Sequence, residues 1–179
     1  MTISLETGRL LLQAPDLEDA VDVMVLANNP RVTAMLASMP FPYRVSDALA
    51  WIRFARASHA GRSRRGFGIY LKARRPEFIG SCGVGPFGAD SEPHLGYWIG
   101  EPHWGRGYAQ EAARAVLTHS FAALALPAIH SGARPDNPAS RAILQKLGFR
   151  HRGAGSVYST ARRRIEIVDL FKLDAVDWK

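Results

Sequence analysis

The most informative part of the chain is His94-Leu-Gly-Tyr-Trp-Ile-Gly-Glu-Pro-His-Trp-Gly-Arg-Gly-Tyr-Ala-Gln-Glu111. Its first part, Leu95 to Ile99, is short, apolar and aromatic, which is typical of a β-strand. Apolar residues then follow at helical spacing from Tyr108 onward. A turn that contains Gly105 and Gly107 joins the two. The pattern therefore predicts a strand that enters a helix through a glycine-rich turn.

This turn has features that suit an anion. Glycine lets the backbone turn tightly and approach a ligand, because no Cβ stands in the way. The start of a helix leaves N–H groups unpaired and carries a partial positive charge, so it binds phosphate groups well. Arg106 adds a cation. The alternative is a tight connection that binds nothing. The spacing fits neither a dinucleotide fold nor a P-loop, because it lacks Gly-x-Gly-x-x-Gly and Gly-Lys-Ser/Thr.

The flanking segments alternate between helical and strand patterns. Upstream we expect a strand over 9–13, a helix from Asp16 to about Asn28, a second helix that Ser46 caps, and strands over 67–71 and 78–84 with a hairpin connection over 73–77. Downstream we expect a strand over 128–133, a helix over 138–147 that Gly148 ends, and closing strands over 157–158 and 165–173. This order predicts an α/β (α+β) fold, with a mixed sheet and helices on both faces.

The length and composition are those of one globular domain of ordinary size. The 179 residues suffice for one domain, which we expect to span 1–179. Cys82 is the only cysteine, so no internal disulfide can form. Residues 1–12 lack a signal-peptide pattern, and no segment has the roughly 20 apolar residues of a membrane span. We therefore expect a cytoplasmic protein that does not contact a membrane.

The charge is strongly positive. There are 23 Lys and Arg against 16 Asp and Glu, a formal net charge of +7, which would suit an anionic cofactor or a nucleic acid. The densest basic runs are Arg62 to Arg65, Arg74-Arg75 and Arg162 to Arg164. Each lies in a polar stretch, so we expect solvated tips rather than a nucleic-acid site. No basic motif with interleaved aromatic residues supports RNA binding.

A family resemblance runs through the chain in order. Trp104-Gly-Arg-Gly-Tyr-Ala109 with Glu111-Ala112 resembles motif A of the GNAT N-acetyltransferases, whose pattern is Gln/Arg-x-x-Gly-x-Gly/Ala. Trp104 replaces the usual Gln or Arg, a departure shared by the RimJ/RimL-type branch of ribosomal-protein-alanine N-acetyltransferases. Further segments resemble that branch: Thr7-Gly-Arg-Leu-Leu-Leu12, Phe78-Ile-Gly-Ser-Cys-Gly83, Gly96-Tyr-Trp-Ile99, Pro135-Asp-Asn-Pro-Ala-Ser140 and Leu147-Gly-Phe149. The resemblance implies a GNAT-type, mostly antiparallel, seven-stranded sheet and acetyl-CoA as co-substrate.

The resemblance also implies a set of cofactor contacts, in which backbone amides of the turn bind the pyrophosphate of acetyl-CoA. The implied cofactor-binding residues are Ile99, Trp104, Gly105, Arg106, Gly107, Tyr108, Ala109, Asn137 and Ser140. Asn137 would contact the pantetheine arm, although Asn137-Pro138 also reads as an ordinary helix start. Ser140 would lie near the thioester sulfur and donate a proton to the departing thiolate, or it would merely cap its own backbone. No metal site is predicted.

The general base is the main departure from the family. The branch usually has Glu two residues before the Gly-Tyr pair, and this chain has His94 there. Strand alternation places His94 on one face with Gly96 and Trp98, and a histidine can accept a proton near neutral pH. Glu92 and Glu101 are the alternative bases, directly or through water. His94 is otherwise a polar strand-end residue without a role, while Glu111, Cys82 and His103 are expected to be structural.

The implied reaction is direct transfer of acetyl to a primary amine in a ternary complex, with the oxyanion bound by a backbone N–H near Ile99. An α-amino group loses its proton more easily than a lysine, which favours a protein or peptide N-terminus as acceptor. Small amines remain open, as does a homodimer. The missing Glu leaves a non-catalytic acyl-CoA-binding or sensing domain as an alternative, and the charge leaves an RNA-binding module as another.

Overall fold

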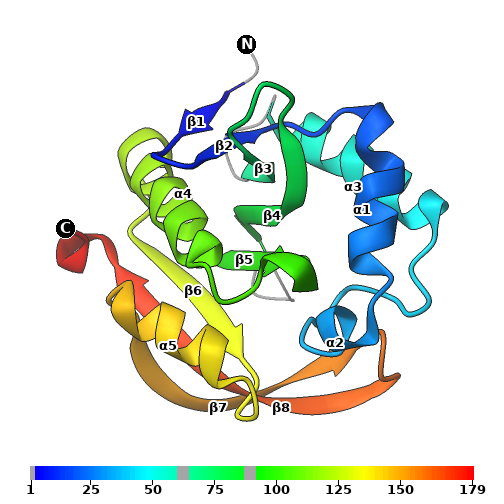
Figure 1. Cartoon of the computed structure of the whole chain (residues 1–179). Helices are drawn as coiled ribbons and strands as arrows, with labels where there is room; N and C mark the ends of the chain where they lie inside the picture. The colour runs from blue at the N-terminus through cyan, green and yellow to red at the C-terminus, as the bar shows by residue number, and fades with distance from the viewer. Residues whose placement is uncertain (1–2, 60–64, 87–91) are drawn as a thin grey trace.

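The computed structural model describes residues 3–59, 65–86 and 92–179, whose strands form one eight-stranded sheet (Figure 1). The strands are β1 Leu5–Glu6, β2 Leu10–Gln13, β3 Arg65–Leu71, β4 Glu77–Pro86, β5 Pro93–Ile99, β6 Ala128–Ala133, β7 Arg150–Ser159 and β8 Arg164–Asp174. Their order across the sheet is β1-β2-β3-β4-β5-β6-β8-β7. Neighbouring strands are antiparallel except β5 and β6, which are parallel.

Helices cover both faces of this sheet (Figure 1). The α-helices are α1 Ala20–Ala27, α2 Pro30–Thr33, α3 Val45–Ser58, α4 Tyr108–Leu124 and α5 Pro138–Lys146, with short 3-10 helices η1 Leu17–Asp19, η2 Glu101–His103 and η3 Ala175–Asp177. α4 and α5 pack on one face, and α1 and α3 pack on the other. The predicted mixed, mostly antiparallel sheet with helices on both faces is confirmed.

The sheet has one strand more than the seven expected. The additional strand, β1, has only two residues and pairs with β2 through Leu5 and Leu12. A strand this short has no alternation that a sequence pattern can reveal. β7 begins at Arg150, whereas only 157–158 was expected. Its first half is rich in glycine and arginine, so pairing with β8 rather than strand propensity places it in the sheet.

Two helix starts differ from the sequence expectation. α3 begins at Val45 and Arg44 is the residue before it, so Ser46 lies inside the first turn. The Asp47 carboxylate accepts a hydrogen bond from the Arg44 backbone N–H at 2.8 Å and fixes this start. The short helix α2 was not expected, because Pro30, Pro40 and Pro42 indicate a broken segment, but Pro30 is the first residue of this helix, where proline is tolerated. Asn29 caps it by accepting from the Arg31 backbone N–H at 2.9 Å.

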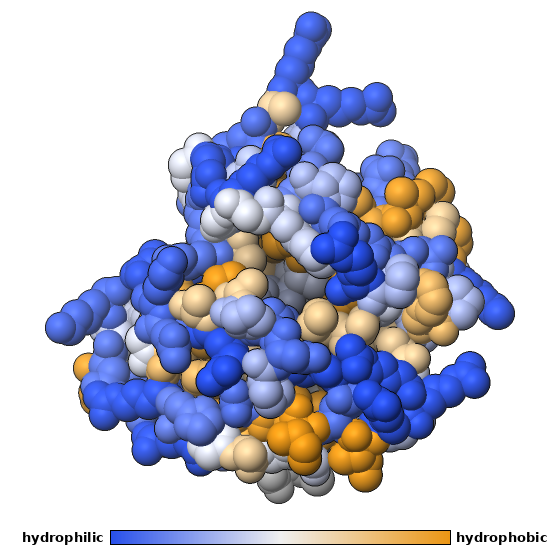
Figure 2. Space-filling view, turned by 60° about the horizontal axis from the view of Figure 1, so that its bottom comes forward, coloured by the Kyte–Doolittle hydropathy of each residue, from blue (hydrophilic) through white to orange (hydrophobic). Residues whose placement is uncertain are grey.

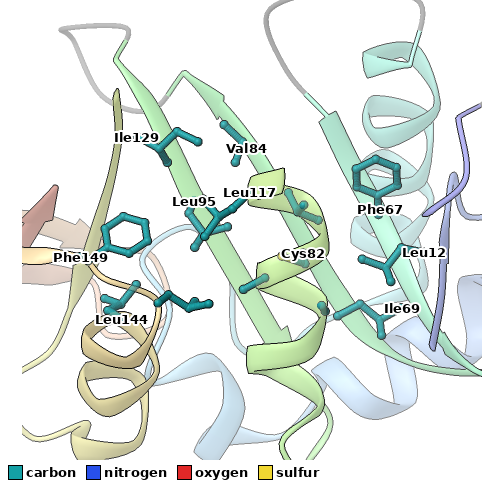
Figure 3. Packing of buried hydrophobic residues seen from close by; sticks show 14 of the residues in the cluster. Leu12, Phe67, Ile69, Cys82, Val84, Leu95, Leu117, Ile129, Leu144 and Phe149 are labelled. Atoms are coloured by element: carbon teal, nitrogen blue, oxygen red, sulfur yellow. The ribbon is translucent and has the colours of Figure 1, made fainter. Parts of the chain in front are cut away.

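The hydrophobic core is divided by the sheet into two clusters. On the α4/α5 face, Leu117 of α4 and Leu144 of α5 point toward sheet residues such as Leu95 and Ile129 (Figure 3). On the other face, α1 and α3 pack on Tyr70 and Phe78. Leu95, Tyr97 and Ile99 of β5 pack in the α4/α5 cluster and Trp98 packs in the other, because successive side chains of a strand point to opposite faces. Packing therefore fixes the α4/α5 face of β5 along its length and the other face at Trp98.

The sheet opens between β5 and β6. The two strands pair at only one position, His94 with His130. Just beyond it, the buried hydroxyl of Ser131 donates to the Leu95 carbonyl at 3.0 Å. Toward its C-terminal end β5 no longer pairs with β6, and the chain after β6 turns into α5. Backbone pairing therefore does not join the C-terminal ends of these two parallel strands.

On the face that Figure 2 shows, most of the surface is hydrophilic, and hydrophobic side chains gather in separate patches. Among the described residues, no helix is both long enough and apolar enough to cross a membrane.

Candidate functional site

The glycine-rich turn, residues 104–107, follows β5 and η2 and leads directly into α4. Gly105 has φ +74° and Gly107 has φ +78°. These angles lie in the left-handed region, which costs little for glycine and is strained for other residues. Gly107 is the residue immediately before α4, and it makes no side-chain cap. The chain therefore turns from strand to helix within a few residues and leaves the helix start uncapped.

The start of α4 fits an anionic group such as a diphosphate. The first N–H groups of a helix have no partner within the helix, and here no Gly107 side chain covers them. Residues 104–107 are exposed, and a Cβ on Gly105 would meet nothing within 4 Å. Arg106 extends the positive potential of the helix start. Exposed backbone, open space at Gly105 and an arginine thus coincide at the turn.

Glu111, in the first helical turn of α4, anchors the glycine-rich turn through hydrogen bonds to Thr7 and Arg9. Its carboxylate accepts from the Thr7 hydroxyl at 2.6 Å, from the Arg9 backbone N–H at 3.0 Å and from Arg9 Nε at 2.7 Å. Partial burial works against ionisation, but these hydrogen bonds outweigh it and lower the pKa of Glu111. Arg9 also donates to the Arg106 carbonyl at 2.9 Å and lies over the Tyr108 ring. Glu111 is structural, as expected, but its partners are far away in the sequence.

Trp104 links the turn to β5 and to α2. Its indole N–H donates to the Ile99 carbonyl at 2.6 Å, and the Arg31 guanidinium lies 5.5 Å from the centre of its ring. Glu101 accepts from the Asn29 side chain at 2.5 Å and forms an ion pair with Arg31. Both oxygens of Glu101 are therefore engaged, which makes it a bridge to α2 rather than an available base.

A hydroxyl pair lies at the start of α5. Asn137 caps this helix, because its side-chain oxygen accepts from the Ser140 backbone N–H at 3.1 Å. The Ser140 Oγ lies 2.9 Å from the phenol oxygen of Tyr97, which projects from β5. Burial raises the pKa of Tyr97 to about 12, with a smaller opposing effect from the Ser140 hydrogen bond. Tyr97 was not identified from the sequence, although it belongs to the Gly-Tyr pair whose alternation places it opposite His94.

His94 lies near the other end of β5. Its Nδ1 is 2.9 Å from the Glu92 carbonyl oxygen, and its ring centre is 5.5 Å from that of His130. The Glu92 carboxylate approaches His130 Nε2 at 3.3 Å. Burial lowers the pKa of His130, and the nearby Glu92 opposes this. At about 3.3 Å per residue, the His94 backbone is roughly 10 Å along the strand from Tyr97.

The β5 face that carries His94 is open in its middle. Gly96 is exposed, and a Cβ added there would meet nothing within 4 Å. The neighbouring residue on β4 is Gly83, so the strip beside it also lacks a side chain. Trp98 follows on the same face and is partly buried against the α1/α3 cluster. The structure therefore leaves backbone accessible between His94 and Trp98.

The described basic runs are mostly exposed, as expected, but one of them also forms ion pairs. Arg162 and Arg164 both form ion pairs with Glu166, at 3.6 and 2.5 Å, and Arg134 pairs with the same carboxylate. Arg74-Arg75 lies in the exposed turn between β3 and β4. Residues 62–64 of the first run lie outside the described residues. Within the described ranges, no group of three His, Cys, Asp or Glu side chains is arranged to hold a metal ion.

The chain is similar in sequence and in fold to known acetyltransferases. The sequence profile of the acetyltransferase (GNAT) domain matches residues 9–150. The uncharacterized N-acetyltransferase p20 of Bacillus licheniformis is 33% identical over 172 residues, which is 95% of either chain. The structure of Mycobacterium smegmatis RimJ in complex with CoA-disulfide has a TM-score of 0.78 at 24% identity, covering 98% of this chain and 87% of that one. RimL, a ribosomal L7/L12 alpha-N-protein acetyltransferase solved with coenzyme A, has a TM-score of 0.78 at 17% identity, covering 96% and 98%.

Proposed function

Because this chain belongs to the GNAT acetyltransferase family, we propose that it transfers the acetyl group of acetyl-CoA to a primary amine by direct attack in a ternary complex. The observation that carries the proposal is the uncapped start of α4 behind Gly105 and Gly107. It lies at the C-terminal end of β5, the end toward which β5 and β6 part. The residues 1–179 would act as one N-acetyltransferase domain.

Acetyl-CoA supplies an activated acyl group on a thiol that can leave. The backbone amides between Trp104 and Ala109 would hold its diphosphate, with Arg106 as an additional cation. Asn137 and Ser140 would contact the pantetheine end of the cofactor, where the Ser140 hydroxyl would donate to the departing sulfur. The oxyanion needs a hydrogen-bond donor, so it would bind a backbone N–H near Ile99, whose carbonyl accepts from the Trp104 indole. Exposure and positive charge at the turn support this assignment.

His94 is the proposed general base. A carbonyl oxygen can only accept, so the hydrogen bond to Glu92 requires His94 Nδ1 to carry the proton. In the neutral ring the lone pair is then on Nε2, which is the state a base needs. Glu92 is the weaker candidate, because its carboxylate already lies beside His130. We assign Glu92 to orienting His94 through its main-chain carbonyl.

The proposed acceptor is the α-amino group of a protein or peptide. An α-amino group has a pKa near 8 and is therefore more often deprotonated at neutral pH than a lysine, whose pKa is about 10.4. The open strip at Gly96 gives an amine access to β5 from the face opposite Ser140. RimL, of similar fold, is described as an alpha-N-protein acetyltransferase. A small amine as acceptor, a homodimer and a cytoplasmic location remain predictions from the sequence.

The test combines CoA binding with a turnover screen. Isothermal titration of CoA should show binding to the wild type, and Gly107→Ala should bind about 10-fold more weakly. An alanine at φ +78° is strained, and its Cβ would lie 3.5 Å from the Arg9 guanidinium that holds the turn. Gly153→Ala is the matched control, because it has φ +113° on β7 but nothing within 4 Å of its Cβ.

Release of free CoA would then be followed with N-terminal peptides and with small amines. Release with peptides beginning in a free α-amino group, and none with N-blocked peptides that retain lysine, supports the proposed acceptor. A folded wild type that does not bind CoA would refute the function itself. CoA binding without turnover of any amine would instead indicate the non-catalytic, acyl-CoA-sensing alternative.

A further inference from the structure

Tyr97 is the side chain that reaches from β5 toward α5 where β5 and β6 have parted. It projects to the face of the α4/α5 core, opposite His94 and Gly96, and is partly buried there. Its phenol oxygen lies 2.9 Å from Ser140 Oγ and 3.3 Å from the Ser140 carbonyl oxygen. The two residues are 43 positions apart in the sequence. They are therefore brought together by the fold and not by a local turn.

The direction of the hydrogen bond in this pair decides which proton is available. Either hydroxyl can donate across the 2.9 Å contact between Tyr97 and Ser140 Oγ, and the phenol's other acceptor, the Ser140 carbonyl oxygen, is farther away at 3.3 Å. Burial raises the pKa of Tyr97 to about 12, so the phenol keeps its proton at neutral pH and can donate it. The Ser140 backbone N–H is already bound to Asn137. When Tyr97 donates to Oγ, the Ser140 hydroxyl proton must point away from Tyr97.

We propose that Tyr97 is a positioning residue that orients the Ser140 hydroxyl toward the sulfur of the CoA thioester. This inference rests on the proposed function. In the reaction the C–N bond to the amine forms and the C–S bond breaks, with its electron pair remaining on sulfur. The Ser140 O–H then donates a hydrogen bond to the thiolate. The amine's proton leaves on the opposite face, by way of His94, and solvent protonates the thiolate after release.

A purely structural role makes a different prediction. If the Tyr97–Ser140 bond only ties β5 to α5, its loss should change stability without changing the chemistry of the bound thiol. If the bond directs Ser140 to sulfur, its loss should raise the pKa of the thiol of bound CoA, because a donor to the thiolate favours the charged form. This thiol pKa can be measured without turnover, from the ultraviolet absorbance of the thiolate as pH is varied.

The experiment measures the thiol pKa of CoA bound to the wild type, Tyr97→Phe, Ser140→Ala and the double variant. At a fixed pH below the pKa, Tyr97→Phe should give roughly 3- to 10-fold less thiolate, which is the typical net effect of one hydrogen bond. Ser140→Ala should lose at least as much, and the double variant no more than Ser140→Ala. The kcat for acetyl transfer should fall in parallel, with the KM for acetyl-CoA little changed.

Tyr70→Phe is the matched control. It also removes the hydroxyl of a buried tyrosine, which here donates to Asp19 at 2.5 Å on the α1/α3 face. It should leave the thiol pKa of bound CoA unchanged. If Tyr97→Phe folds poorly, Ser140→Ala carries the test, because Asn137 still caps α5.

Two negative outcomes are distinguishable. CoA that binds to the variants with an unaltered thiol pKa would overturn the positioning role of Tyr97 while leaving the proposed function intact. Failure of CoA to bind to the wild type would overturn the proposed function instead.

Discussion

Arg9 and Glu111 are 102 residues apart, yet the Glu111 carboxylate accepts hydrogen bonds from both the backbone and the guanidinium of Arg9. The same arginine donates to the Arg106 carbonyl inside the glycine-rich turn. The position of the turn is therefore coupled to the beginning of the sheet, because β2 starts one residue after Arg9.

Glu111→Gln should destabilise the protein by about 1 kcal/mol at neutral pH, since the pair is half-exposed and screened by solvent. The folded-state pKa of Glu111 is lowered. Its contribution is therefore fully present above the unfolded pKa of about 4.3 and is lost as pH falls through the lower folded pKa. Urea unfolding of both proteins at several pH values tests this. The difference should shrink in acid, and exposed Glu18→Gln should show neither effect.

Trp104→Phe should weaken CoA binding several-fold while keeping a ring beneath Arg31. The change removes the indole N–H and leaves the Ile99 carbonyl without this donor, which loosens the turn. Trp178→Phe is the control, because Trp178 also lies under an arginine, Arg114, at 5.2 Å but is remote from the turn. Titration calorimetry with CoA compares the two. Equal affinities for CoA would show that Trp104 does not set the geometry of the turn.

His94→Ala should lower turnover about 100-fold near neutral pH, the usual size of a general-base contribution. The remaining activity should rise with pH, because it would depend on amine that is already deprotonated. His151→Ala, on β7, is the comparison. The pH profile of kcat/KM at saturating acetyl-CoA is the measurement. A profile identical to that of the wild type would exclude His94 as the base.

Gly96→Val should raise the KM for the amine at least tenfold and leave CoA affinity unchanged. A Cβ at this position has nothing within 4 Å, and valine suits a strand, so the variant should fold. The larger side chain would occupy the open strip between His94 and Trp98. Bulky acceptors should lose more activity than small ones, which provides an internal control. An unaltered KM for every acceptor would place the amine elsewhere.

Much of the fold follows from local sequence patterns. The run from 128 to 133 and the helix that begins at Tyr108 were predicted with the observed starts, because each has a clear periodicity and a clear boundary. β7 was predicted too short, because Arg150-His-Arg-Gly-Ala-Gly155 has little strand propensity and is ordered by pairing with β8. Propensity is local, whereas the pairing that overrides it is not.

The candidate site was likewise predictable only where its residues are adjacent in the sequence. The turn was predictable, since Gly105, Gly107 and the helix after them are adjacent in sequence. The contacts that fix it were not: Glu111 with Arg9, Glu101 with Arg31, and Tyr97 with Ser140 each join distant segments. Such pairs leave no periodic signal in a single sequence. The resemblance to a family located the turn and the start of α5, but it did not identify Tyr97.

The alternation of β5 makes the length of this strand a constraint in its own right. In the proposed reaction its even-numbered residues, His94 and Gly96, serve the amine, and odd-numbered Tyr97 serves the thioester through Ser140. Inserting or deleting a single residue between 94 and 97 would exchange the two sets of side chains across the sheet. Substitutions in this strand can therefore adjust the choice of acceptor. A one-residue change in its length would instead move His94 and Gly96 away from the amine and Tyr97 away from the thioester at the same time.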